Sequence, residues 1–112
     1  MPNVPPPTNA LVELAEVLGE DNVRSLVRTF LRDFPGSLRD LNSGDRKQRH
    51  RIAHSMKSNS HLMGALPLSQ RMAALETRLA DESAPDVGAD DLAAITAEYE
   101  TIAGPLRAFV GD

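Results

Sequence analysis

The residues of this sequence whose types and spacing could support chemistry gather around one histidine, His54. Lys57 follows it by three residues and Ser58 by four. In an α-helix, residues at i, i+3 and i+4 share one face, so a cation and a small hydroxyl side chain would lie within about a turn of the imidazole. A neutral imidazole is nucleophilic near pH 7, and a nearby cation stabilises the oxygens of a phosphoryl group. The pattern therefore predicts a site for phosphoryl transfer.

A helix has to hold these side chains, and we predict a single helix over residues 45–65, capped by Asp45. The side chains expected to face the core follow a separate stripe, namely Ile52, Ala53, Met56, Ser60 and Met63. His54 is therefore expected at the edge of the buried stripe, open to water. Glu76, on the next predicted helix, is the candidate acceptor that would fix the tautomer of the imidazole.

The remaining apolar residues recur at steps of three and four, and no segment alternates with a period of two. We predict an all-α fold, an antiparallel up-and-down four-helix bundle with a short additional N-terminal helix. Residues 1–8 are expected to form a proline-rich flexible tail, and residues 9–112 one helical-bundle domain. The fourth helix is expected to begin near Pro67, and the last near Asp90 or Asp91.

Local sequence signals place the remaining helix ends and bends. Thr8 or Asn9 is expected to cap the first helix, which Gly19 ends, and Asp21 is expected to cap the second. Pro35 predicts a kink rather than a stop, because the apolar stripe resumes after it. Another proline, at position 105, predicts a bend or a frayed last turn. The polar segment 81–90 is the most flexible one expected.

The composition of the 112 residues restricts the class of protein. Cysteine is absent, which excludes disulfides and thiolate metal sites, and the net charge of −4 argues against general nucleic-acid binding. No apolar run approaches the ~20 residues of a membrane span. We therefore expect a cytoplasmic protein. The basic residues crowd the central helix, namely Arg46, Lys47, Arg49, Arg51 and Lys57.

The central segment resembles the signature of histidine-containing phosphotransfer (HPt) domains. The sequence reads AHSMKSNS at residues 53–60, MGA at 63–65 and LE at 75–76. The family pattern is A-H-x-L-K-G-S-[SA]-x-x-[LVM]-G-A with a downstream L-[EQ]. Among its departures from the family, the chain has Ser58 where the pattern has glycine, and Arg49, five residues before the histidine, where the family is commonly apolar.

The resemblance implies a phosphorelay intermediate without its own kinase active site. His54 would accept a phosphoryl group from a receiver-domain aspartate or a kinase and pass it to another receiver. Lys57 would steady the phosphoryl oxygens, and Glu76 would hydrogen-bond the imidazole. No cofactor is expected, because Mg²⁺ would belong to the receiver partner. The initiating methionine favours a free-standing protein, with a domain of a longer kinase as the alternative.

For docking, we expect a hydrophobic patch beside the active histidine, formed by the second and third helices and ringed by basic residues. Arg51, Ser58 and His61 are expected on that docking surface. The partners would be response-regulator receivers and a hybrid histidine kinase, with neither nucleic acid nor a membrane, and the protein would be a monomer.

Two other readings of the site stay open. His50, His54 and His61 lie on nearly one helical face, and histidines at i and i+4 have the spacing of zinc ligands. Neighbouring cations, and the length that three such residues span, oppose a metal site there. The other alternative is a helical bundle that docks a response regulator without transferring phosphate.

Overall fold

The computed structural model describes residues 4–111, which fold into five α-helices and no strands. The helices are α1 (Asn9–Leu18), α2 (Glu20–Leu41), α3 (Arg46–Leu62), α4 (Leu66–Ala80) and α5 (Ala89–Val110). The prediction of an all-α bundle is confirmed. Of the predicted tail, residues 4–8 precede the first helix without regular structure, and residues 1–3 lie outside the described residues, as does residue 112. The division into tail and domain stays a prediction.

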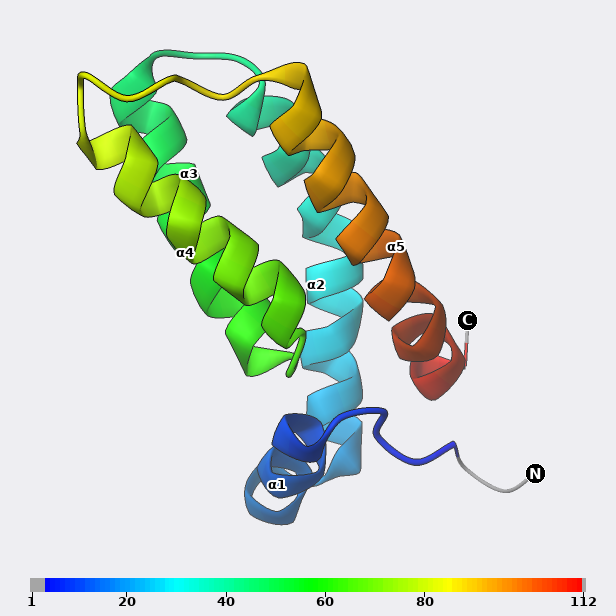
Figure 1. Cartoon of the computed structure of the whole chain (residues 1–112). Coiled ribbons are helices and arrows are strands. Elements are labelled where there is room, and N and C mark those ends of the chain that lie inside the picture. Colours follow the sequence, from blue (N-terminus) through cyan, green and yellow to red (C-terminus); the bar gives the residue numbers. More distant parts are fainter. Residues whose placement is uncertain (1–3, 112) are drawn as a thin grey trace.

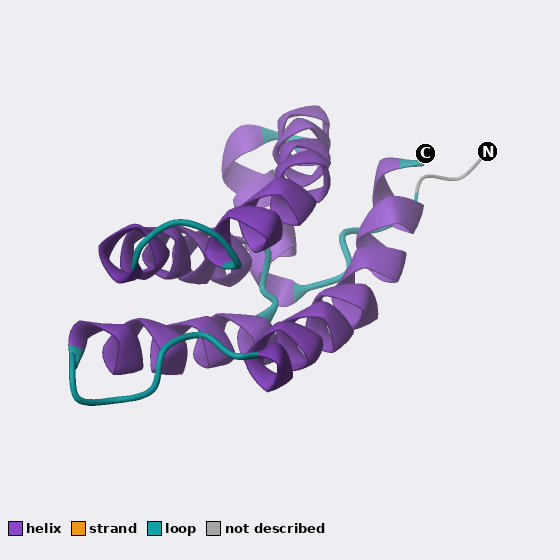
Figure 2. Cartoon of the chain, turned by 90° about the horizontal axis from the view of Figure 1, so that it is seen from above, coloured by secondary structure: helices purple, strands orange, loops and turns teal. Residues whose placement is uncertain are grey.

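The helices α2 to α5 run in alternating directions when the chain is followed from cyan to red in Figure 1. α3 and α4 lie side by side as a helical hairpin, and α2 packs against both α3 and α5. The short α1 is set against the start of α2, at one end of the molecule. Figure 2, which views the molecule from above, shows the loops that join the helices. The α3–α4 hairpin carries the residues singled out in the sequence.

The start of α3 is fixed by a capping box. The Asp45 side chain accepts a hydrogen bond from the backbone N–H of Gln48 at 2.9 Å, and the Gln48 side chain accepts one from the Asp45 backbone N–H at 3.0 Å. The two bonds satisfy donors that the first turn of a helix leaves free. The predicted cap at Asp45 is therefore confirmed.

The helix ends earlier than predicted, at Leu62 rather than Ala65, because Gly64 takes a left-handed conformation with φ of 74°. The N–H of Ala65 bonds back to the Ser60 carbonyl at 2.9 Å, which closes the end of α3. A Cβ atom at Gly64 would also collide with the Thr8 side chain. Glycine is thus required at this turn both for its φ angle and for the close approach.

Thr8 links α1 to this same turn. Its hydroxyl donates to the Met63 carbonyl at 2.9 Å and accepts from the Leu11 N–H at 3.2 Å, so Thr8 is the cap of α1.

The predicted cap of α2 is wrong. Gly19, at φ 87°, separates the two helices, and its carbonyl already accepts from the Val23 N–H, so Asp21 lies inside the first turn.

Both internal prolines lie within continuous helices. Pro35 has no N–H for the Leu31 carbonyl one turn earlier, and the Tyr99 hydroxyl of α5 donates to that carbonyl at 3.4 Å. The aromatic ring of Tyr99 stacks on Phe34, with 4.1 Å between ring centroids. A substitute donor thus lies where the helix loses its own. α5 continues past Pro105 to Val110, so its last turn is not frayed.

The buried side chains form one core to which every helix contributes. The largest side chains with almost no exposed surface are Leu11, Leu41, Met63, Leu68, Met72, Ile95, Leu106 and Phe109. Of the predicted core stripe of α3, Ala53, Met56, Ser60 and Met63 are buried and Ile52 is partly buried. The opposite face of α3 is left to solvent, and His54 lies on it.

The 81–88 connection between α4 and α5 is held by arginines. Arg46 donates to carbonyls of Leu79 and Asp81, at 3.1 and 2.6 Å. Arg78 donates to the Asp91 carboxylate at 2.5 Å and to backbone carbonyls of the loop. These contacts fix the loop path at both ends.

Among the described residues, no helix is long and apolar enough to cross a bilayer.

Candidate functional site

The site lies on the α3–α4 hairpin, where antiparallel packing brings distant positions together. His54 precedes Ala65 by 11 residues and Glu76 follows it by 11, so the two positions face each other once the chain reverses at residues 63–65. Lys57 lies one turn along α3 from His54, on the side that faces α4. The turn thus determines which residue of α4 meets the histidine.

Three predicted side chains meet at this point. The Nδ1 atom of His54 lies 2.5 Å from Oε2 of Glu76, and the Nζ atom of Lys57 lies 2.6 Å from Oε1 of the same carboxylate. The His54 side chain is 59% exposed, whereas that of Glu76 is only 17% exposed. The structure therefore holds an accessible imidazole against a carboxylate that is largely shielded from water.

The contact assigns roles to the two ring nitrogens. An ionised carboxylate has no proton to give, so Nδ1 of His54 donates to Glu76. In the neutral ring the other nitrogen, Nε2, then carries the lone pair and is the nucleophilic atom. Because Nδ1 is occupied by the carboxylate, Nε2 is also the nitrogen free to meet a partner.

Glu76 is kept ionised by its neighbours. The hydrogen bond from the Lys57 ammonium lowers the pKa of the Glu76 carboxyl below its ordinary value of 4.5, and the bond from His54 lowers it further, against the opposing effect of burial. Protonation of Glu76 would turn one carboxylate oxygen into a donor and so remove the acceptor of one of its two neighbours. The three-residue contact is therefore stable through neutral pH.

Lys57 is not wholly used by this ion pair. An ammonium has three donors, and one of them is directed at Glu76. Its side chain is 32% exposed, so the remaining donors can reach a group that approaches from solvent. The backbone at this position is fixed by Ser69 of α4, whose hydroxyl donates to the Lys57 carbonyl at 3.2 Å.

Ser69 is a positioning residue that the sequence reasoning missed. It is 7% exposed and lies between Leu68 and Met72 in the buried stripe of α4. The available signal was a polar residue within an apolar helical stripe, which needs a hydrogen-bond partner when buried.

The residues expected at a docking surface are all exposed on α3. Arg51, Ser58 and His61 have no side-chain hydrogen bond or ion pair to any residue between positions 4 and 111. They lie on the same face as His54, because the helical period places each of them within about 60° of it. This face of α3 is thus free of partners within the chain.

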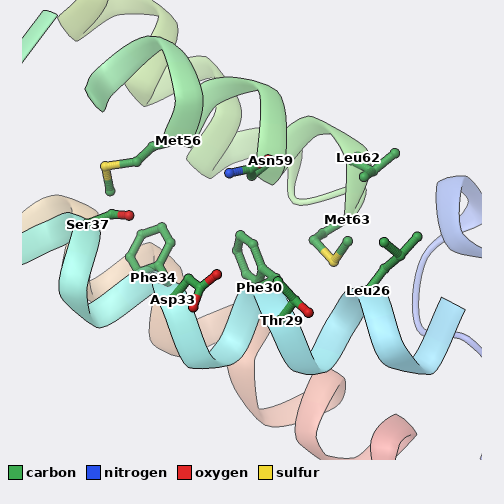
Figure 3. Close-up of a pocket in the computed structure, with 10 residues that line it drawn as sticks. All are labelled: Leu26, Thr29, Phe30, Asp33, Phe34, Ser37, Met56, Asn59, Leu62 and Met63. Carbon is green, nitrogen blue, oxygen red and sulfur yellow. The ribbon is translucent and has the colours of Figure 1, made fainter. Parts of the chain in front are cut away.

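A small apolar hollow of about 120 Å³ lies between α2 and α3 (Figure 3). Its lining residues are Leu26, Thr29, Phe30, Asp33, Phe34, Ser37, Met56, Asn59, Leu62 and Met63. The second and third helices therefore do form an apolar hollow, but His54 is not among its lining residues and the expected basic ring is absent from them. The one charged lining residue is Asp33, because the basic residues of α3 lie nearer its N-terminal end and on other faces.

The other expectations for α3 concern its remaining histidines and Arg49. Arg49 is turned toward the loop after α4 and pairs with Asp86 at 2.9 Å, so it reaches solvent without touching the histidine. His50 and His61 are not drawn into the three-residue contact. Within residues 4–111, no group of three or more histidine or acidic side chains is placed to hold a metal ion.

Comparison with protein families gives a match over most of the chain. The model of the Hpt domain family matches residues 25–105, which include the whole α3–α4 hairpin and most of α2 and α5. No curated protein and no solved structure matches the chain. The family match thus covers the elements that form the site and omits α1.

Proposed function

The chain belongs to the Hpt domain family, whose members are histidine phosphotransfer modules of two-component systems, and we propose that His54 is its phosphorylated residue. The observation that supports this assignment most strongly is the exposed imidazole whose Nδ1 is held by Glu76. That contact leaves Nε2 as the nucleophile. Family members are phosphotransfer modules rather than classical enzymes, and the chemistry is correspondingly simple.

In the proposed reaction, Nε2 of His54 attacks the phosphorus of a receiver's aspartyl phosphate. The N–P bond forms as the P–O bond to the aspartate breaks, and the aspartate leaves as a carboxylate. The Nδ1 proton stays in its hydrogen bond to Glu76, which offsets the positive charge that develops on the ring. The reverse reaction passes the phosphoryl group to a second receiver. The module thereby acts as an intermediate between two aspartates.

Lys57 is proposed to steady the phosphoryl oxygens. Its ammonium already lies beside the imidazole through the ion pair with Glu76, so it needs little movement to donate to an incoming phosphoryl group. Any Mg²⁺ required by the reaction is expected in the receiver. The cytoplasmic location and the monomeric state expected from the sequence stay predictions.

The receiver is proposed to dock over the exposed face of α3 and the hollow between α2 and α3. Leu62, at the rim of this hollow, is 43% exposed, which provides apolar surface for an interface. Ser58 lies one turn from His54 on the face that the receiver would cover. Because Ser58 carries a side chain where the family has glycine, it should restrict how closely the receiver approaches.

The test is phosphoryl transfer from a receiver charged with acetyl phosphate. We expect the wild-type protein to acquire an acid-labile, base-stable phosphate and His54→Gln to acquire none. His61→Gln is the matched control, because it removes another exposed histidine of the same helix and should leave the label intact. Binding of a receiver without any label would favour the docking-module alternative, and stoichiometric zinc binding lost in His50→Ala would favour the metal site.

A further inference from the structure

The charge balance of the site indicates that Lys57 alone supplies too little positive charge for a bound phosphoryl group. Lys57 is paired with Glu76 at 2.6 Å, so the two charges largely cancel, and the nucleophilic form of the His54 ring carries no charge of its own. A phosphoryl group brings about two negative charges. Lys57 therefore has to serve two anions at once after transfer, and a second positive group near Nε2 would stabilise the phosphorylated state.

Arg51 is the cation whose position fits this need. It precedes His54 by three residues, as Lys57 follows it by three, so the helical period places the two cations about 60° to either side of the histidine. Lys57 lies on the side of α4 and Glu76. Arg51 lies on the opposite side, where it lines a hollow between α2 and α3.

The direction of helical side chains brings the imidazole of His54 over the turn that carries Arg51. In an α-helix, Cα–Cβ bonds tilt toward the N-terminus, so a side chain covers the turn that precedes it. The imidazole of His54 therefore extends over the turn that carries Arg51. The long Lys57 side chain extends back over the turn of His54 in the same way. Arg51 leans by the same rule toward Gln48, with which it lines the hollow, so its long side chain has to turn back along the helix to meet a phosphoryl group on Nε2.

The guanidinium of Arg51 is available for a ligand. Other arginines of the bundle are used inside the fold: Arg46 and Arg78 bind loop carbonyls, and Arg49 pairs with Asp86. Arg51 is exposed and makes no side-chain hydrogen bond or ion pair with any described residue, although Asp40 lines the same hollow. A planar guanidinium can bind two phosphoryl oxygens at once.

We propose that Arg51 is a second phosphoryl ligand, which binds the phosphoryl oxygens on His54 from the side opposite Lys57. The inference rests on the proposed function and assigns Arg51 a role beyond docking. In this role Arg51 stabilises the phosphorylated protein relative to the unphosphorylated one. Arg51 should therefore shift the equilibrium of phosphoryl exchange with a receiver, in addition to any effect on the rate at which the two proteins associate.

The equilibrium constant for exchange separates this role from docking. At protein concentrations well below the dissociation constant of the complex, docking affects the forward and reverse rates equally and leaves the equilibrium unchanged. A ligand of the phosphoryl group stabilises one side only. We expect Arg51→Ala to lower the equilibrium ratio of phosphorylated to unphosphorylated protein about five- to tenfold, and Arg51→Lys to lower it by a smaller factor.

The matched control is Lys47→Ala. Lys47 is another exposed cation on this face of α3, without a partner among the described residues, and lies almost two turns from His54. Its removal should change the equilibrium less than twofold. An unchanged equilibrium in Arg51→Ala, or equal effects of the two variants, would overturn the inference while leaving His54 as the carrier. Absence of phosphate from His54 in the wild type would instead overturn the proposed function.

Discussion

Removal of the Glu76 carboxylate tests the geometry of the site most stringently. Glu76→Ala deletes the acceptor of the Nδ1 proton of His54 and the partner of the Lys57 ammonium in one change. A hydrogen bond to a charged group contributes about 1.5–3 kcal/mol. The exposure of His54, at 59%, favours the lower end of that range, because water can replace part of the lost bond.

If about 1.5 kcal/mol of stabilisation of the positive charge that develops on the ring is lost, the rate of phosphoryl transfer should fall about tenfold. Single-turnover transfer from a phosphorylated receiver measures this rate directly. The rate should fall less in Glu76→Gln, because the amide oxygen of glutamine can still accept a hydrogen bond from Nδ1. Nitrogen NMR of the unphosphorylated protein should show the proton on Nδ1 in the wild type and a mixture of tautomers in Glu76→Ala.

The matched control is Glu98→Ala, which removes a carboxylate of similar exposure from an ion pair with Arg71 between α4 and α5. It should transfer phosphate at the wild-type rate. Equal slowing in both variants would mean that loss of a helix-to-helix ion pair, and not the histidine contact, is responsible. A wild-type rate in Glu76→Ala would refute the role given to Glu76 in the reaction.

Three further predictions concern Lys57, Gly64 and the acid limb of stability. Lys57→Ala should slow transfer about ten- to hundredfold while shifting the free energy of unfolding by less than about 1 kcal/mol; an unchanged rate would remove Lys57 from the reaction. Gly64→Ala should lower the free energy of unfolding by about 1–3 kcal/mol in urea denaturation, because φ is 74° there and the new methyl group meets Thr8; full stability would show that the turn relaxes freely. The folded-state pKa of Glu76 lies below its ordinary value of 4.5, so the unfolded chain binds the proton more tightly and stability should fall as the pH drops below about 4.5. The stability of Glu76→Gln should lack that part of the pH dependence. Identical pH profiles of stability for the variant and the wild type would contradict the prediction.

The sequence was informative where local periodicity decides the structure. The spacing of His54, Lys57 and Glu76 about the glycine turn is enough to place them together once two antiparallel helices are assumed. The buried stripe of α3 and the Asp45 cap follow in the same way from residues within a few positions of each other. Such features depend on helical geometry, which is nearly the same in every protein.

Features that depend on the path of a loop or on a distant helix could not be predicted. The start of α2 follows from the conformation of Gly19, which the sequence signal at Asp21 does not reveal. The donation of the Tyr99 hydroxyl to the Leu31 carbonyl joins residues 68 positions apart. The pairing of Arg49 with Asp86 depends likewise on how the loop after α4 folds back.

The prediction of a basic ring around the docking hollow was wrong for a related reason. Sequence position placed the cations on α3, but several of them are turned toward carbonyls and carboxylates of α4 and its loop. Which face a long side chain takes is decided by the partner it meets. Arg51 remains exposed to solvent and therefore available to a phosphoryl group.

The central claim is that the phosphoryl group is carried on one particular nitrogen. Long-range proton–nitrogen NMR of the protein after reaction with a phosphorylated receiver identifies that atom. The structure predicts phosphorus bonded to Nε2 of His54 and a proton retained on Nδ1, next to Glu76. Phosphorus on Nδ1, on another histidine, or on none of them would contradict the account.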